Sequence, residues 1–367
     1  MMKRNILAIV IPALLVGTTN AAEIYNKDGN KLDLYGKVDA RHFFGKRSSG
    51  DDSRVSVGIK GDTKLSDQVT GFGHFEWSTK TSKNEMENEN TNRLAYVGLK
   101  IADFGSLDYG RNYGVVYDVN SWTGVLPLYG ADSMFHGDKY MTSRNLLTYR
   151  SSDFFGLVDG LNFALQYQGK NSETNKSSNS HHFKNNGHGF DIAAKYDIGW
   201  GVTLGAGYIK TDRHLTKSEQ ANSGAIGNNA DGWNAGIKYN DNNLYLAAMY
   251  GETSNMTRFG EIVEGIDRSK IANKTTNFEI VGQYLFNEIG LKPSIAYIQS
   301  KGSKLNDDGY SQQNLVKYVS LGAFYYFNKN LTAVVDYKIN LVNNNDFTQK
   351  YGISSDNLIG LGLVYQF

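Results

Sequence analysis

Cysteine is absent from the 367 residues, and proline occurs only three times. The absence of cysteine excludes disulfide bonds and thiolate metal sites. Neither sign of charge is in excess, because 38 basic residues stand against 37 acidic ones and give a formal net charge of +1. This balance gives no global bias toward nucleic acid, so any electrostatic function must come from the local arrangement of charges.

Long apolar runs are also scarce, and none reaches the roughly 20 residues that a membrane-spanning helix needs. The one short run, residues 6–16, follows Lys3 and Arg4 and is followed by a small-residue cleavage site at residues 19–21. This order is typical of a secretory signal peptide. The alternative is an uncleaved N-terminal anchor helix. We expect residues 1–21 to be removed, which leaves residues 22–367 as a single domain.

Tyrosine, phenylalanine and glycine are abundant, with 24, 18 and 40 copies, and apolar residues recur with a period of two. In residues 331–340, for example, Leu331, Ala333 and Val335 alternate with polar or smaller neighbours. A period of two predicts β-strands with one apolar face. We expect sixteen strands, near 32–43, 53–64, 69–79, 91–100, 105–113, 144–150, 161–170, 188–197, 201–211, 232–240, 244–253, 274–286, 291–300, 316–327, 331–340 and 356–367.

The alternation fits a soluble β-sandwich as well as a membrane barrel, in which the apolar face meets lipid and the polar face lines the lumen. Many strands end in an aromatic residue on their apolar face, as in the aromatic girdles at a membrane interface. The following seven carry this signal: Tyr167, Tyr196, Tyr208, Tyr239, Tyr284, Tyr297 and Phe327. Their recurrence in strand after strand favours the barrel.

The connections alternate in length, as they do between the two rims of an outer-membrane barrel. Short turns occur at 197–200, 241–243 and 328–330. Long polar stretches occur at 171–187, 212–231, 254–273, 301–315 and 341–355. The last strand ends on Phe367, which resembles the signal read by the outer-membrane barrel-assembly machinery. The sequence therefore predicts an all-β fold, a closed 16-stranded antiparallel transmembrane barrel wide enough for an aqueous channel.

Several segments resemble the enterobacterial general diffusion porins of the outer membrane protein C and F type. The matching stretches are 22–37 (AEIYNKDGNKLDLYGK), 108–118 (DYGRNYGVVYD), 153–163 (DFFGLVDGLNF), 242–247 (NNLYLA) and 326–330 (YFNKN). The resemblance spans residues 22–367. It implies a homotrimer in the outer membrane of a Gram-negative bacterium, in contact with lipid and lipopolysaccharide. Each barrel would pass ions and small hydrophilic solutes through its own pore, narrowed by an inward-folded third loop.

The resemblance also implies where the constriction lies. The insertion between Tyr113 and Thr142 matches the third loop, and its tip carries Leu126, Pro127, Leu128, Tyr129 and Gly130. A disordered surface loop is the alternative. Opposite the loop, the family carries a basic wall. The matching positions here are Lys37, Arg54 and Arg93, which strand parity turns toward the lumen, and Arg144, in a segment shorter than usual.

The loop departs from the family in its acids. Gly124 and Leu128 occupy the two tip positions that usually carry carboxylates, while Asp118 and Asp132 remain on the limbs of the loop. Selectivity follows the sign of pore-lining charge, so we expect weak cation selectivity or a lean toward anions. Asp39, Asp62 and Glu76 could face the lumen and restore the balance.

The second loop, residues 80–92, carries Glu85, which matches the acid that latches this loop onto a neighbouring subunit. Arg111 is its expected partner. The alternative is a solvated acidic loop that binds divalent ions near lipopolysaccharide.

Three other functions compete with a general porin. An outer-membrane enzyme would need a Ser/His or Asp/His constellation, and no nucleophile-elbow, phosphate-loop or zinc-protease motif appears. The exposed loop histidines His181, His182 and His188 favour solvation over a metal site, so no metal or cofactor is expected. A substrate-preferring porin for anions or sugars is the second rival, although Phe72, Tyr109 and Tyr117 form no aromatic ladder in the sequence. A plugged structural barrel is the third.

Overall fold

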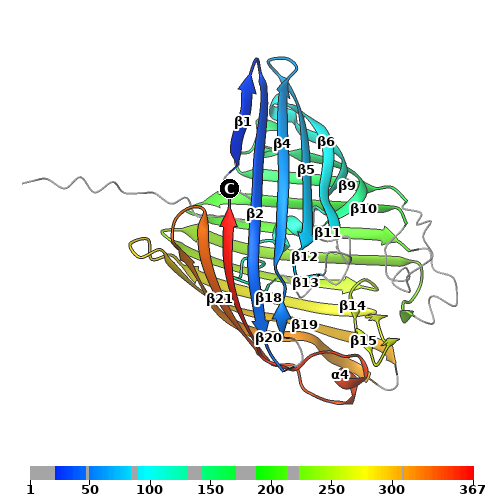
Figure 1. Ribbon diagram of the computed structural model, residues 1–367. Coiled ribbons are helices and arrows are strands. Elements are labelled where there is room, and N and C mark those ends of the chain that lie inside the picture. Colours follow the sequence, from blue (N-terminus) through cyan, green and yellow to red (C-terminus); the bar gives the residue numbers. More distant parts are fainter. Residues whose placement is uncertain are drawn as a thin grey trace, which may run out of the picture.

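Sixteen antiparallel strands form one closed barrel in the computed structural model of the chain (Figure 1). The structure describes residues 21–46, 49–83, 90–130, 142–170, 187–213, 223–307 and 310–367. Among these residues, no helix is both long enough and apolar enough to cross a membrane.

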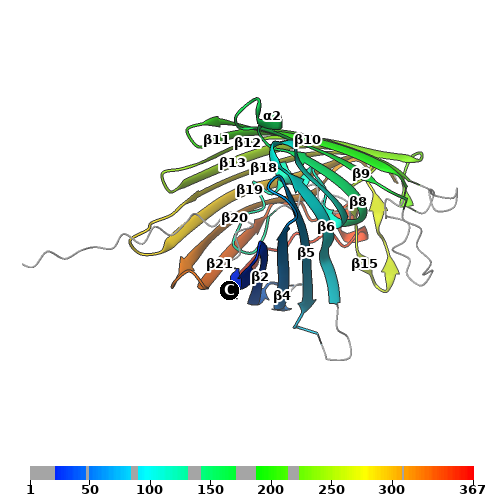
Figure 2. The same ribbon diagram turned by 90° about the horizontal axis from the view of Figure 1, so that it is seen from above.

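Except for the two strands that flank residues 307–310, the predicted strands are confirmed to within a few residues, and consecutive strands pair in sequence order. The sixteen are β2 (Asn30–Phe44), β4 (Arg54–Lys64), β5 (Val69–Lys80), β6 (Asn90–Ile101), β7 (Gly105–Tyr113), β8 (Thr142–Ser151), β9 (Leu161–Gln168), β10 (Gly189–Gly199), β11 (Val202–Asp212), β12 (Asn229–Asp241), β13 (Leu244–Ser254), β18 (Lys274–Tyr284), β19 (Leu291–Asp307), β20 (Tyr310–Tyr326), β21 (Leu331–Asn340) and β22 (Leu358–Gln366). Seen from above, β2, β4 and β5 face β11, β12 and β13 across the lumen (Figure 2).

The barrel closes at β2, because the two ends of the chain pair along the same edge of this strand. The first strand, β1 (Ala22–Lys27), pairs with residues 30–34 of β2, and β22 pairs with residues 37–44. Between them, the backbone N–H and C=O of Gly36 bond to Phe367 at 2.9 and 3.0 Å. The C-terminus accordingly lies beside β1 and β2 (Figure 1). Within the described residues, each of the sixteen barrel strands therefore has a partner along both edges, which is the condition for placing a sheet in hydrocarbon.

Buried polar side chains alternate with exposed apolar ones, which is the reverse of the pattern in a soluble protein. In β18, Asn277, Glu279 and Gln283 are buried, whereas Phe278 and Ile280 on the other face are exposed. The buried face is the lumen and the exposed face is the outer wall, as in transmembrane barrels. Five of the seven predicted girdle aromatics are at least 38% exposed, and Tyr239 and Tyr297 are half-buried.

Short turns and long loops alternate between the two rims, as predicted. One stretch that was expected to be a loop, 301–315, proves to be strand instead, because β19 and β20 extend to Asp307 and Tyr310. The ladder continues beyond the apolar belt. There, register shifts at Ser300/Lys301 and Ser303/Asp307 interrupt the alternation, and Leu305 and Leu315 pack against Phe259 and Phe347 of neighbouring loops. The loop before β18 contains two short hairpins, β14 (Arg258–Phe259) with β17 (Lys270–Ile271) and β15 (Ile262–Val263) with β16 (Ile266–Asp267). Helix α4 (Asp346–Lys350) lies in the last loop.

The contact between Gly36 and Phe367 predicts that one added methyl group lowers the stability of the barrel at Gly36 but not at a glycine with open space. A Cβ on Gly36 would lie 2.5 Å from the ring of Phe367, whereas a Cβ on Gly61 would meet its nearest atom at an ordinary 3.5 Å. We expect Gly36→Ala to destabilise the barrel by about 1–3 kcal/mol through overpacking, and Gly61→Ala to change it little. Urea unfolding in detergent measures both, and equal midpoint shifts would contradict the seam.

Candidate functional site

The segment after β7, termed loop 3 (residues 114–141, described to Gly130), folds into the barrel and packs against its inner wall. Val119, Trp122 and Leu126 are buried in one apolar cluster with lumen-facing residues of the strands. This packing excludes a disordered surface loop for residues 114–130. The wall residues in the cluster are Ile209, Ala230, Ala247, Met249, Val281, Ala296, Ile298 and Tyr318.

Glycines on the inner wall make room for the loop. A Cβ on Gly205 would lie 2.6 Å from the indole of Trp122, and one on Gly236 would lie 2.9 Å from Val119. At the other end of the loop, a Cβ on Gly322 would lie 2.8 Å from Pro127. Side chains at these positions would hold the loop off the wall, so the glycines set how deeply it lies in the lumen.

Polar side chains of successive strands hold the loop backbone. Asn234 of β12 donates to the carbonyl of Val116 at 3.0 Å, and Tyr245 of β13 donates to that of Trp122 at 2.6 Å. Gln283 of β18 donates to the carbonyl of Val125 at 2.8 Å. These bonds satisfy loop carbonyls that the lumen wall would otherwise desolvate, so they fix the path of the loop across the barrel.

Asp336 of β21 holds the tip of loop 3. Its carboxylate accepts from the backbone N–H of Leu128 at 3.1 Å and of Tyr129 at 3.4 Å, and from the hydroxyl of Ser320 at 2.5 Å. Beyond this point the ring of Tyr129 lies 5.6 Å from that of Phe43. The loop therefore crosses from β7 to the seam between β22 and β2.

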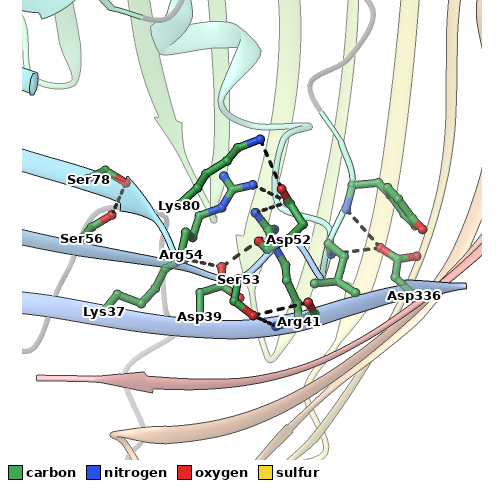
Figure 3. Close-up of polar contacts among 12 residues, drawn as sticks. Lys37, Asp39, Arg41, Asp52, Ser53, Arg54, Ser56, Ser78, Lys80 and Asp336 are labelled. Atoms are coloured by element: carbon green, nitrogen blue, oxygen red, sulfur yellow. Dashed lines mark hydrogen bonds and ion pairs between the residues drawn. The ribbon is translucent and has the colours of Figure 1, made fainter. Parts of the chain in front are cut away.

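The wall opposite the loop carries cations interleaved with acids. Lys37 lies 3.4 Å from Asp39, and Arg54 lies 2.7 Å from Asp52. Figure 3 shows that Arg41 and Lys80 also converge on Asp52, at 3.0 and 3.5 Å, while Asp336 holds the loop backbone nearby. The basic wall in the structure therefore consists of Lys37, Arg41, Arg54, Lys80 and Arg93.

Arg93 is the most closely held cation of the basic wall. Its guanidinium donates to Glu76 at 2.6 Å and to the hydroxyl of Tyr113 at 2.9 Å. Tyr35 donates to the other oxygen of Glu76 at 2.8 Å, and its hydroxyl lies 2.5 Å from Nε2 of His74. Asp39 and Glu76 thus face the lumen and offset part of the basic charge there.

The structure does not place Arg144 on the basic wall. A bulge in β8 pairs Asn112 with Ser143 and leaves Asn145 with a φ of +62°. Paired residues share a face, and Asn112 points inward to Asp108. Ser143 therefore faces the lumen and the exposed Arg144 faces away from it. Simple parity fails because the bulge adds one residue.

Arg150 of β8 lies in the lumen instead and holds the start of loop 3. It donates to Asp118 of helix α1 (Tyr117–Asn120) at 2.6 and 3.2 Å, and Lys195 of β10 lies 3.4 Å from the same carboxylate. Burial alone would raise the pKa of Asp118, but Arg150 and Lys195 outweigh it and hold this pKa below the ordinary 3.8. The sequence missed Arg41, Lys80 and Arg150, although Arg41 and Lys80 share the parity of their lumen-facing neighbours.

Three predicted site residues receive little or no structural account. Asp132 and Glu85 lie outside the described residues. Arg111 is described and shares the outward face of β7 with Leu107 and Tyr109, which are 45 and 54% exposed. The side chain of Arg111 therefore faces away from the lumen.

Within the described ranges, no group of three His, Asp or Glu side chains could hold a metal ion. His188 accepts or donates a 2.7 Å hydrogen bond with Tyr167, and His181 and His182 lie outside the described residues.

The fold and the site together define a class: a membrane β-barrel whose open lumen is restricted by an inward loop. A model of the Gram-negative porins matches residues 27–367, and the chain belongs to this family. It is 56% identical over 373 residues to outer membrane porin F of Xenorhabdus nematophila and 52% identical over 381 residues to outer membrane protein F of Serratia marcescens. Both matches cover all of each chain. The chain is a general diffusion porin of the outer membrane, and not an enzyme.

A solved relative agrees with the fold. The structure of Salmonella typhi OmpF in complex with daunomycin superimposes with a TM-score of 0.84 at 42% identity. The match covers 94% of this chain and 100% of that one.

The hydrogen bonds from loop 3 to Asp336 predict that loss of this carboxylate changes the channel current. Asp336→Ala leaves the N–H groups of Leu128 and Tyr129 without their acceptor, a loss of about 1–3 kcal/mol at the loop tip. We expect the open-channel current noise to increase in planar bilayers. Ser320→Ala is the control, because it removes one hydrogen bond from Asp336 but keeps the loop contacts. Quiet currents in Asp336→Ala would show that the tip does not depend on this carboxylate.

The ion pair at Asp118 predicts a response to acid. Because the folded-state pKa is lowered, the pair stabilises the loop fully above about pH 4 and is lost as the pH falls through the folded value. We expect current fluctuations in the wild type to rise below pH 3.8, and Asp118→Asn to show them already at pH 6. Recordings between pH 6 and 2.5 test this, and identical profiles for the two proteins would be inconsistent with it.

Proposed function

We propose that loop 3 and the basic wall form a constriction that sorts solutes mainly by size and leans toward anions. One observation carries this proposal: residues 119–130 contain no acidic side chain. The nearest acid on the loop, Asp118, is shared by Arg150 and Lys195. The loop side of the constriction is therefore formally neutral along its described tip.

The basic wall opposite has five cations against the three carboxylates of Asp39, Asp52 and Glu76, a formal excess of two positive charges. Selectivity follows the sign of the charge that lines a pore. An excess of positive charge on one side, with no carboxylate at Gly124 or Leu128 on the other, favours anions over cations by a modest factor.

An aromatic slide for sugars has little support. Tyr109 is 54% exposed on the outer wall. Phe72 packs edge-on to Tyr96, and Tyr117 stacks on Tyr113 at 4.9 Å. The three predicted candidates do not line one path, which favours a general over a sugar-specific porin.

The proposal includes the assembly that the family resemblance implies. The chain would lose residues 1–21, be inserted by the barrel-assembly machinery that reads Phe367, and form a homotrimer in contact with lipopolysaccharide. The outward position of Arg111 supports the proposed latch with Glu85 of a neighbouring copy. Phe367 at the end of β22 is half-buried, and its backbone bonds to Gly36 where the barrel closes.

The selectivity proposal predicts the sign of a reversal potential. In a planar bilayer with a KCl gradient, we expect the wild type to show a small potential of the sign that marks chloride preference, with conductance steps in threes. Gly124 has no positive φ, so Gly124→Asp should fold and shift the permeability ratio toward potassium by roughly twofold.

Gly124→Asn is the matched neutral control and should leave the ratio near that of the wild type. Strong potassium preference in the wild type would contradict the proposal. Equal shifts for Asp and Asn would mean that size, not charge, acts at this position.

A further inference from the structure

Three cations of the basic wall converge on one carboxylate, that of Asp52. It lies 3.0 Å from the guanidinium of Arg41, 2.7 Å from that of Arg54 and 3.5 Å from the ammonium of Lys80. The backbone carbonyl of Asp52 also accepts from Nε of Arg41 at 3.0 Å. The three cations come from β2, β4 and β5, and they meet in the short connection between β3 (Gly50–Asp51) and β4 (Figure 3).

The strand register brings these cations together in a way that makes them repel one another. Arg54 and Lys80 are directly opposite partners in the ladder between β4 and β5. Arg54 also pairs with Asp39, which precedes Arg41 by two residues on the same face of β2. Like charges directly opposite in an antiparallel pair are destabilising. Asp52 lies among the three cations and offsets this repulsion, so their long side chains gather on the wall.

No second acid can replace Asp52 in this cluster. Asp39 is the other carboxylate near Arg41, and it lies farther away, at 3.8 Å. Among the described residues, Arg54 and Lys80 form no ion pair except the one with Asp52. The contacts hold Arg41 most tightly, because its side chain is only 9% exposed. The position of all three cations therefore depends on one carboxylate.

The cluster around Asp52 borders the tip of loop 3. The guanidinium of Arg41 lies 5.9 Å from the ring centroid of Phe43. That ring lies 5.6 Å from the ring of Tyr129 at the loop tip. A side chain that leaves the wall here enters the gap between the basic wall and the loop. The position of Arg41 and its neighbours therefore affects both the width and the charge of the constriction.

We propose that Asp52 is a positioning residue that sets the specificity of the pore by holding Arg41, Arg54 and Lys80 against the wall. The inference rests on the constriction proposed above and deepens it by naming the residue that regulates its width and its charge preference together. Without the carboxylate, the three cations repel one another and extend toward loop 3. The opening then becomes narrower and more positive, so large uncharged solutes pass more slowly and chloride is favoured further.

Asp52→Asn tests the proposal, because it removes the charge of this side chain and keeps its size. In planar bilayers with a KCl gradient, we expect the chloride-to-potassium permeability ratio to rise by roughly twofold over the wild type. Neutral sugars separate position from charge in liposome swelling assays. The rate for the trisaccharide raffinose should fall by about half, whereas the rate for arabinose should change little. Asp52→Glu keeps the carboxylate and should retain most of the wild-type behaviour in both assays.

Asp51→Asn is the matched control, since it removes the same charge one residue away. Asp51 pairs with His42, which alternates with the lumen-facing Arg41 and therefore lies on the outer face of β2. Its carboxylate accepts from the N–H and the hydroxyl of Ser53 at 2.8 and 2.5 Å, and it has no ion pair within the described part of the chain. Both assays should therefore give wild-type values for this variant.

The mobility of unheated samples on SDS gels shows that each variant is folded, and Asp52→Ser serves if the asparagine variant is not. A shift in the permeability ratio with unchanged raffinose influx would mean that Asp52 acts only through its charge, which overturns the positioning role. Wild-type values in both assays overturn the proposal as a whole. A potassium-selective wild type contradicts the anion lean but leaves this inference standing, because each readout is taken relative to the wild type.

Discussion

Every backbone N–H and C=O of a membrane-spanning strand must find its partner within the protein, because hydrocarbon offers none. In this chain that requirement is met at β2, where the N-terminal strand β1 and the C-terminal residue Phe367 together complete the last open edge. Once the ring is closed, the outer face must be apolar, and polar residues are turned inward. A polar interior of sixteen strands is too wide for side chains to fill, so it can admit both water and a folded loop.

Loop 3 packs against the inner wall in the way that elements of a soluble protein pack in its core. Trp122 and Leu126 pack on small or apolar wall residues, while Asn234 and Gln283 satisfy the loop carbonyls. The same contacts decide which charges a solute meets. Asp336 and Glu279 are buried beneath loop 3 and accept hydrogen bonds from it, so they add no carboxylate to the open face of the constriction. Anchoring and selectivity are therefore two results of one arrangement.

Strand positions, the closed barrel and the inward loop could be predicted from the period of two, the turn pattern and the family resemblance. The error at 301–315 arose because, beyond the apolar belt, register shifts in the ladder interrupt the alternation that marks a strand. The misplacement of Arg144 arose from a bulge, which a left-handed Asn145 permits but no strand pattern reveals. Strand parity alone could have placed Arg41 and Lys80 on the lumen face. The anchoring of loop 3 by Asn234, Gln283 and Asp336 could not be predicted, because it depends on the path of the loop over the wall.

The position of loop 3 inside the lumen is the claim on which the constriction and its charge balance depend. Because the chain has no cysteine, Gly124→Cys provides a unique thiol at the described tip of the loop. Single-channel recording during addition of a bulky thiol reagent tests the position directly. The inward loop predicts that each modification reduces the conductance of one pore in a discrete step. Unchanged conductance after complete modification would place the loop outside the path of the ions and contradict the account.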